Sequence, residues 1–430
     1  MRFGGSKSLF FKLVLISIFL TSTAFADPRT LAIRLFTRLA GVPPTESQIA
    51  TMESLIAAGN LAQAAQVATD KVSAKGFYNV TVKHFASSLS NRDQSPLRVL
   101  NDFMAMIVGV ARDESDAREL LFGDFMYVGN ANKLALPALA VPVNSRLNNR
   151  QNNVHFDAMD NLDLVDLLER RVLSALASST IVADQNQHPI GPYIEPGSPA
   201  NDPNNTKMSD ITGQQTAGLL TTRTWALEHL IAGTNRRGIE YAMLIFLCKP
   251  MVEMADGTML DYHVRRDVDR APQGSTAVFH TQCRTCHAGM DALGGAFSKY
   301  DYDETRQTLT FNRGGVSTKM NKLPIYFEGK VTTDESWENL FVQNQNLSLG
   351  WRGSVAGQGI KELGTMLSNS HQFSVCMSSR VFESVCYRKH VVPEEQSFID
   401  GLANKFEGSG YNLRRLFEEA AILPICLGKE

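Results

Sequence analysis

Helical spacing dominates the hydrophobic pattern of the first third of the chain. From residue 31 to about residue 121, apolar side chains recur every three or four positions, which is the spacing of one buried face of a helix. The segment from Gly41 to Thr45 is expected to end the first helix, and Thr45 with Gln48 three residues later matches the capping box that opens a helix. The pattern therefore predicts a helical N-terminal domain.

Helical periodicity returns in several later segments. It predicts helices over 157–177, 222–232, 238–247, 359–387 and 394–419. Two short segments, 308–310 and 324–331, are typical of short strands or extended loops. Five prolines lie between His188 and Lys207, which predicts a long loop or linker. We therefore expect a mainly α, multi-helical protein.

The first 26 residues have the pattern of a secretory signal peptide. Lys7 and Lys12 precede an apolar run that ends at Leu20, and the small-residue triplet from Ala24 to Ala26 follows. The apolar run is shorter than the roughly 20 residues that a membrane-spanning helix requires. We expect cleavage after Ala26 and a periplasmic protein without an integral membrane span.

Composition and charge narrow the possible partners. The formal net charge is -2, which gives no electrostatic reason to expect a nucleic acid or an anionic membrane as partner. The basic pairs Arg236-Arg237 and Arg265-Arg266 are expected on solvated faces of the molecule.

The expected exported chain has six cysteines, and the even number left after the pair at 283 and 286 suits an oxidising compartment. Two of them, Cys283 and Cys286, belong to the motif described next, which leaves Cys248, Cys376, Cys386 and Cys426. Cys376 and Cys386 are expected on one helix, ten residues or roughly 15 Å apart, which is too far for a disulfide. A bridge from Cys426 to one of them is the more plausible pairing, and buried thiols are the alternative.

The segment from Cys283 to His287 has the sequence Cys-Arg-Thr-Cys-His. Cys-x-x-Cys-His is the attachment motif of haem c. Two thiols form thioethers with the two vinyl groups, and the adjacent imidazole coordinates the iron. The motif predicts one covalent haem on Cys283 and Cys286, with His287 as the proximal ligand.

Two other uses of this motif fit the sequence less well. A thioredoxin-like dithiol sits in a compact βαβ unit, whereas a polar loop over 267–276 precedes Cys283. A zinc site needs a second Cys or His pair, and the nearest other cysteine, Cys248, has no pair around it.

The residue opposite His287 on the iron decides what such a haem can do. Met320 is our first candidate because it lies in a polar loop, where a thioether has little packing role. The other candidates are less suitable: one methionine lies too close to His287, two have the pattern of helix core, and two are histidines of the flanking segments. In that order they are Met290, Met366 and Met377, His280 and His263.

The residues around the haem motif resemble those of the large planctomycete-type periplasmic c-type cytochromes, whose modules are mostly known as domains of unknown function. That family follows its haem motif with Met/Ile-Asp-Pro-Leu-Gly-Phe and then Phe-Asp. Here Met290-Asp291-Ala292-Leu293-Gly294-Gly295 and Tyr300-Asp301 stand in those places. Ala292 replaces the family's Pro and Gly295 its Phe, so packing beside the haem is expected to differ.

Looser likenesses extend over most of the chain. They are the segments 118–121, 124–128 and 218–221, then Thr234, Arg237-Gly238, Leu247-Cys248, Phe373, Cys376, Phe406, 409–411, Leu413-Arg414 and Leu416. The resemblance implies a mainly helical haem protein, but it names no reaction.

The chain is long enough for more than one domain. We expect a signal peptide over 1–26, a helical N-terminal domain over 27–187, a linker over 188–207, a cytochrome c-like haem module over 208–345 and a helical C-terminal module over 346–430.

Two functions are compatible with a single haem. The first is electron transfer to or from a redox partner protein that the sequence does not identify. The second is a haem-dependent periplasmic oxidoreductase, peroxidase-like or acting on a small substrate, with an open sixth iron position. A partner-binding protein with an accessory haem is a further alternative. One haem motif argues against the familiar two-haem peroxidases, and whether the protein is an enzyme stays open.

Overall fold

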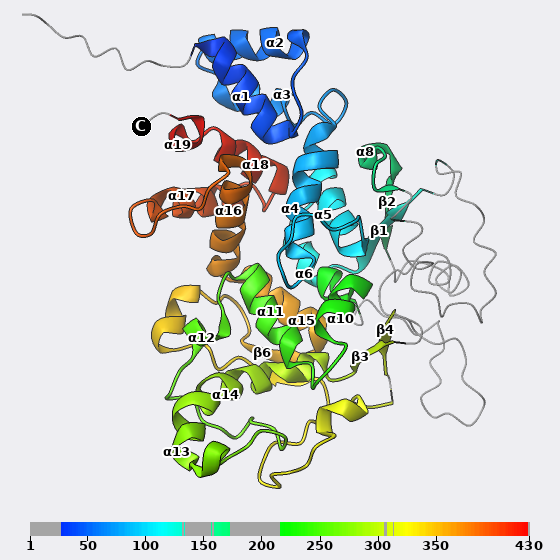
Figure 1. Ribbon diagram of the computed structural model, residues 1–430, viewed down its shortest axis with the longest axis vertical. Helices are drawn as coiled ribbons and strands as arrows, with labels where there is room; N and C mark the ends of the chain where they lie inside the picture. Colours follow the sequence, from blue (N-terminus) through cyan, green and yellow to red (C-terminus); the bar gives the residue numbers. More distant parts are fainter. Residues whose placement is uncertain are drawn as a thin grey trace, which may run out of the picture.

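The computed structural model describes residues 27–130, 133, 156, 159–172, 216–304, 308–312 and 314–428 (Figure 1). Within these ranges the protein is mainly helical, as predicted. The expected signal peptide and the linker over 188–207 lie outside the described residues. No helix of the described part is long and apolar enough to cross a membrane.

Short helices build the N-terminal part. They are α1 (Pro28–Ala40), α2 (Glu46–Ala57), α3 (Leu61–Val67), the π-helix η1 (Phe77–Val82), α4 (Lys83–Leu89), α5 (Asp102–Arg112) and α6 (Glu119–Phe122). Helix α1 ends at Gly41, whose φ of 70° is the left-handed conformation that glycine adopts without strain. The predicted capping box is confirmed, because Thr45 and Gln48 exchange both of its hydrogen bonds.

The prediction of a helix over 157–177 is wrong for part of its length. Among the described residues of this range, α8 (Leu164–Leu167) is helical, but the next residues form strand β2 (Leu168–Val172), which pairs antiparallel with β1 (Phe125–Gly129). The guanidinium of Arg112 donates to the carbonyl oxygens of Val165 and Leu168, at 3.0 and 2.6 Å. These carbonyls therefore bond to a distant side chain, and pairing with β1 replaces the helix that the spacing favoured.

The central part of the chain contains many short elements. They are η5 (Gly218–Thr221), α10 (Arg223–His229), α11 (Arg236–Phe246), α12 (Met251–Met254), η6 (Pro272–Gly274), α13 (Thr276–Val278), the π-helix η7 (Phe279–Cys283), α14 (Arg284–Leu293), η8 (Gly294–Phe297) and η9 (Thr318–Asn321). Strand β3 (Tyr300–Asp303) pairs with β4 (Thr308–Phe311), as expected for 308–310. The segment 324–331 is an extended loop, tied to Arg265 by one bridge at Lys330.

The C-terminal part is again helical. A hairpin of β5 (Ser336–Glu338) and β6 (Ala356–Gln358), with η10 (Asn344–Leu349) between them, precedes α15 (Gly359–Asn369), α16 (His371–Cys386), α17 (Gln396–Gly408), α18 (Leu413–Ala421) and α19 (Pro424–Leu427). The expected helix over 359–387 is divided at Ser370, whose hydroxyl caps α16 by accepting from the Phe373 N–H.

The C-terminal helices pack on the N-terminal ones. Helix α18 contacts α1, α3 and α5, and α15 contacts α6. The Phe417 ring of α18 meets the rings of Phe77 and Phe85 edge-on, with centroids 5.4 and 5.3 Å apart. Buried apolar residues form one cluster from Leu31 to Leu427, so the core continues across the division that we expect at residue 345.

Two disulfides join distant segments. Cys386 pairs with Cys426, which confirms the expectation that Cys426 bridges to α16. Cys248 pairs with Cys376, a bridge that the sequence did not predict, because the 128 residues between them give no local sign of proximity. Cys283 and Cys286 are left as free thiols.

Candidate functional site

The segment from Cys283 to His287 lies at the junction of η7 and α14. Cys283 is the last residue of η7, and Cys286 and His287 lie in the first turn of α14. Spacings of three and four residues place all three side chains on one face of this helix. Both thiols are partly exposed, whereas the other four cysteines are paired. The fold therefore holds two accessible thiols and an imidazole on one face.

The Cys286 thiol is partly buried. Its sulfur lies 3.7 Å from the carbonyl oxygen of Met251. Burial raises the pKa of this thiol above its usual value, although the Thr285 hydroxyl acts in the opposite direction. Redox-active dithiols need a lowered thiol pKa, so this environment does not favour the thioredoxin-like alternative.

The described residues around the two thiols also lack the further ligands that a zinc site needs. Among the residues that the structure describes, no three His, Cys, Asp or Glu side chains are grouped as a metal site. The thiol pair is therefore not half of a described zinc site.

The imidazole of His287 faces a buried carboxylate. Asp291 lies one turn further along α14, and its side chain is fully buried. His287 Nδ1 lies 3.6 Å from Asp291 Oδ1, slightly beyond hydrogen-bond distance, and this buried nitrogen has no hydrogen-bond partner in the described part of the chain. The side chain as a whole is 26% exposed. One edge of the ring is therefore directed at the carboxylate while part of the ring reaches solvent.

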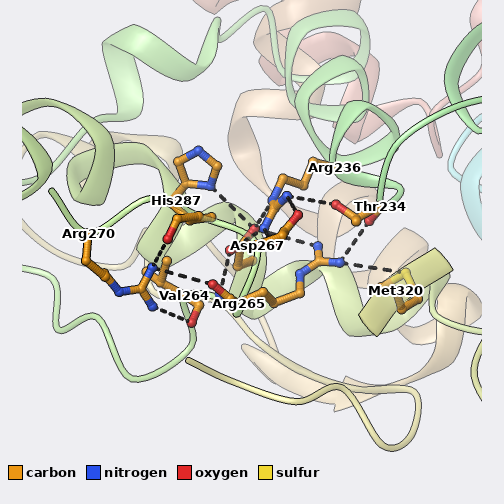
Figure 2. A network of polar contacts seen from close by, with 10 residues as sticks. Thr234, Arg236, Val264, Arg265, Asp267, Arg270, His287 and Met320 are labelled. Atoms are coloured by element: carbon orange, nitrogen blue, oxygen red, sulfur yellow. Dashed lines mark hydrogen bonds and ion pairs between the residues drawn. The ribbon is translucent and has the colours of Figure 1, made fainter. Parts of the chain in front are cut away.

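Two arginines, both labelled in Figure 2, hold the carboxylate of Asp291. Arg236 donates from Nε to Oδ1 at 2.5 Å and from Nη2 to Oδ2 at 3.0 Å. The backbone N–H of Arg265 donates to Oδ2 at 3.0 Å, and its Nη2 lies 3.6 Å from Oδ1. Burial alone would raise the pKa of Asp291, but the charge of Arg265 and the contacts with His287 and Arg236 outweigh it and hold the pKa far below its usual range. Asp291 is therefore an ionised carboxylate inside the protein.

The same arginines bind a second set of acceptors. Arg236 makes a bidentate ion pair with Asp267, at 2.6 and 2.7 Å, and donates to the Thr234 hydroxyl at 2.8 Å. Arg265 Nη1 donates to the Thr234 carbonyl at 2.9 Å. Asp267, Asp291, Arg236 and Arg265 thus form a network of two negative and two positive side chains, which we call the carboxylate–arginine network.

The expectation that these arginines occupy solvated faces is wrong. Arg265 is 1% exposed, and the Arg236 side chain is 18% exposed. A buried guanidinium needs carboxylate partners, and its partners here lie 26 to 55 residues away in sequence. Of the residues in this network, only Asp291 could be linked to His287 from the sequence. Residues four apart on a helix lie on the same face, and Asp291 follows His287 by four.

Met320, the first candidate for the sixth iron ligand, is not brought to His287. It is 2% exposed in η9, and its sulfur lies 3.7 Å from Arg265 Nη1. Figure 2 shows Arg265 between His287 and Met320. Ligation by Met320 stays a prediction about the haem-loaded protein, and it requires this contact to change.

The other candidates are occupied by packing or by polar contacts. Met290, Met366 and Met377 are buried in α14, α15 and α16. His263 Nε2 lies 3.1 Å from Glu338 Oε2, and the His280 ring packs edge-on against Phe279.

Comparisons with protein-family models, with curated proteins and with solved structures find no match for this chain. The site is therefore interpreted from its own residues and contacts.

Proposed function

We propose that this chain is an exported c-type cytochrome that carries one covalent haem and transfers electrons. Cys283 and Cys286 would form the two thioethers, and His287 would be the proximal iron ligand. The observation that carries this proposal is the pair of accessible free thiols beside an imidazole whose Nδ1 is directed at a buried carboxylate.

The residues present fit such a group. A metal-bound histidine normally donates its other ring N–H to a carboxylate or carbonyl, which fixes its tautomer and orientation. His287 Nδ1 is buried, has no hydrogen-bond partner among the described residues and faces Asp291 Oδ1. This arrangement leaves Nε2 as the nitrogen for the iron.

A bound haem would supply reversible one-electron exchange at its iron. The chain's own residues have separate tasks. Cys283 and Cys286 hold the group, His287 binds the metal, and the carboxylate–arginine network fixes the imidazole. The likeness to planctomycete-type cytochromes agrees with this assignment and remains part of the proposal.

A haem-dependent oxidoreductase is the second candidate. It is favoured by one observation, the contact of the Met320 sulfur with Arg265, because a methionine held there leaves the sixth iron position open to a substrate.

Absorption spectra separate the two candidates. The protein is expressed together with haem-attachment machinery and measured in the ferric form and in the dithionite-reduced form, with and without carbon monoxide. A low-spin spectrum that carbon monoxide leaves unchanged supports electron transfer. A high-spin spectrum that shifts with carbon monoxide supports the oxidoreductase.

The variant Met320→Leu, with Met366→Leu as control, identifies the ligand. If Met320 binds the iron, only the first variant converts a low-spin spectrum to a high-spin one. If the Arg265 contact persists, both variants keep the wild-type spectrum.

A further inference from the structure

The acceptor that faces His287 is an anion, and this has consequences for the iron. Asp291 Oδ1 accepts from Arg236 Nε at 2.5 Å and lies 3.6 Å from His287 Nδ1, just beyond hydrogen-bond distance. A carboxylate withdraws the Nδ1 proton more strongly than a neutral carbonyl does, and this makes the other ring nitrogen a more basic ligand. A more basic ligand stabilises ferric iron relative to ferrous iron.

We infer that Asp291 is a positioning residue that accepts the Nδ1 proton of His287 as a buried anion and thereby lowers the reduction potential of the haem. This inference rests on the proposed function, since it needs a haem on His287. It goes beyond that proposal because it gives the direction in which the protein tunes its iron.

The carboxylate–arginine network keeps this acceptor charged. Its two carboxylates and two guanidinium groups balance, so the buried cluster carries no net charge. Arg236 binds Asp291 and Asp267 simultaneously, but only Asp291 contacts the imidazole. The two carboxylates are therefore comparable in charge and differ in their contact with His287.

This difference provides a matched pair of variants. Asp291→Asn removes the charge and the anionic acceptor, whereas Asp267→Asn removes a charge from the same arginine and leaves the imidazole contact in place. Each variant is purified with haem, its fold is checked by circular dichroism, and its midpoint potential is measured by spectroelectrochemical titration.

For D291N we expect the ratio of ferrous to ferric protein at a fixed ambient potential to rise at least tenfold, which corresponds to about 59 mV for one electron. For D267N we expect a rise of less than threefold. Equal shifts in the two variants, or no shift in D291N, would overturn the inference while leaving covalent haem attachment intact. Absence of haem from the wild-type protein would overturn both.

A measurement on the wild-type protein covers the case in which D291N does not fold. With ¹⁵N-labelled histidine, the reduced protein should show a slowly exchanging Nδ1 proton for His287, with carbon monoxide added if the iron is high-spin. The reference is the haem peptide released by proteolysis, in which Nδ1 donates to water. Exchange as fast as in that peptide would overturn the inference.

Discussion

At the scale of single residues, His229 shows how burial sets protonation. Its ring packs against Trp225 and Tyr241, with centroids 4.3 and 4.4 Å away. Burial, together with the charges of Arg92 and Arg237, lowers the pKa of His229 from 6.5 to about 3. The folded protein therefore keeps this histidine neutral at pH values where the unfolded chain is protonated.

The protein should therefore lose stability as the pH is lowered, because protonation of His229 favours the unfolded chain. Stability from a neutral His229 is fully present above pH 6.5 and is lost as the pH falls from 6.5 towards 3. Between pH 6.5 and 5 the loss is about 2 kcal/mol. His229→Phe removes the titrating group, so urea unfolding at pH 7 and pH 5 should show a pH-dependent loss smaller by that amount. An unchanged pH dependence would show that His229 is already charged in the folded protein.

The sequence alone groups Cys283, Cys286 and His287, but it does not predict the surroundings of these residues. Cys283, Cys286 and His287 lie within five residues, so local spacing alone places them on one face of α14. Arg236 and Arg265 reach the same site from other segments of the chain. Since an arginine buried by a distant carboxylate looks like any surface arginine in sequence, their role required the fold.

At the scale of elements, the contact between α6 and α15 depends on one glycine. A Cβ added to Gly364 would lie 1.8 Å from the carbonyl oxygen of Leu121. Backbone cannot move aside as a flexible side chain can, so the two helices must separate if this position gains a methyl group.

Gly364→Ala is therefore expected to lower the free energy of unfolding by about 2–3 kcal/mol. Gly401→Ala in α17 is the matched control, because a Cβ there meets nothing within 4 Å. The control should raise the free energy of unfolding by about 0.5–1 kcal/mol through helix propensity. Urea unfolding of both variants measures the difference, and equal stabilities would mean that α6 and α15 do not pack this closely.

The sequence predicts helix ends well where a capping residue or a proline marks them. It predicts poorly those segments whose structure depends on pairing with a distant part of the chain. The capping box at Thr45 and the end of α11 before Pro250 are local signals, and both agree with the structure. The segment 168–172 has helical spacing, but it is a strand because β1 offers a partner and Arg112 binds its first carbonyl. The sequence of this segment alone gives no sign of a partner so far away in the chain.

At the scale of the whole molecule, one disulfide connects the central and C-terminal parts of the core, and a second connects two C-terminal helices. The Cys248–Cys376 bridge ties the chain just after α11 to the middle of α16, and Cys386–Cys426 ties the end of α16 to α19. Long closed loops restrict the unfolded chain most, so the first bridge should contribute more to stability.

The double variant C248S/C376S should lose about 2–5 kcal/mol of unfolding free energy. The comparison uses haem-free protein, with C283S/C286S as the control that keeps both bridges and should lose much less. Peptide mapping without reductant should recover both cross-linked pairs from the wild type. A bridge between Cys283 and Cys286, or equal losses in the two variants, would contradict this assignment.

Covalent haem on Cys283 and Cys286 is the claim on which the proposed function depends. Intact mass and the pyridine haemochrome spectrum of denatured protein, produced with haem-attachment machinery, test it directly. We predict one haem per chain that survives denaturation in the wild type and in C248S/C376S, and none in C283S/C286S. Wild-type protein without covalent haem, or C283S/C286S with it, would contradict the account.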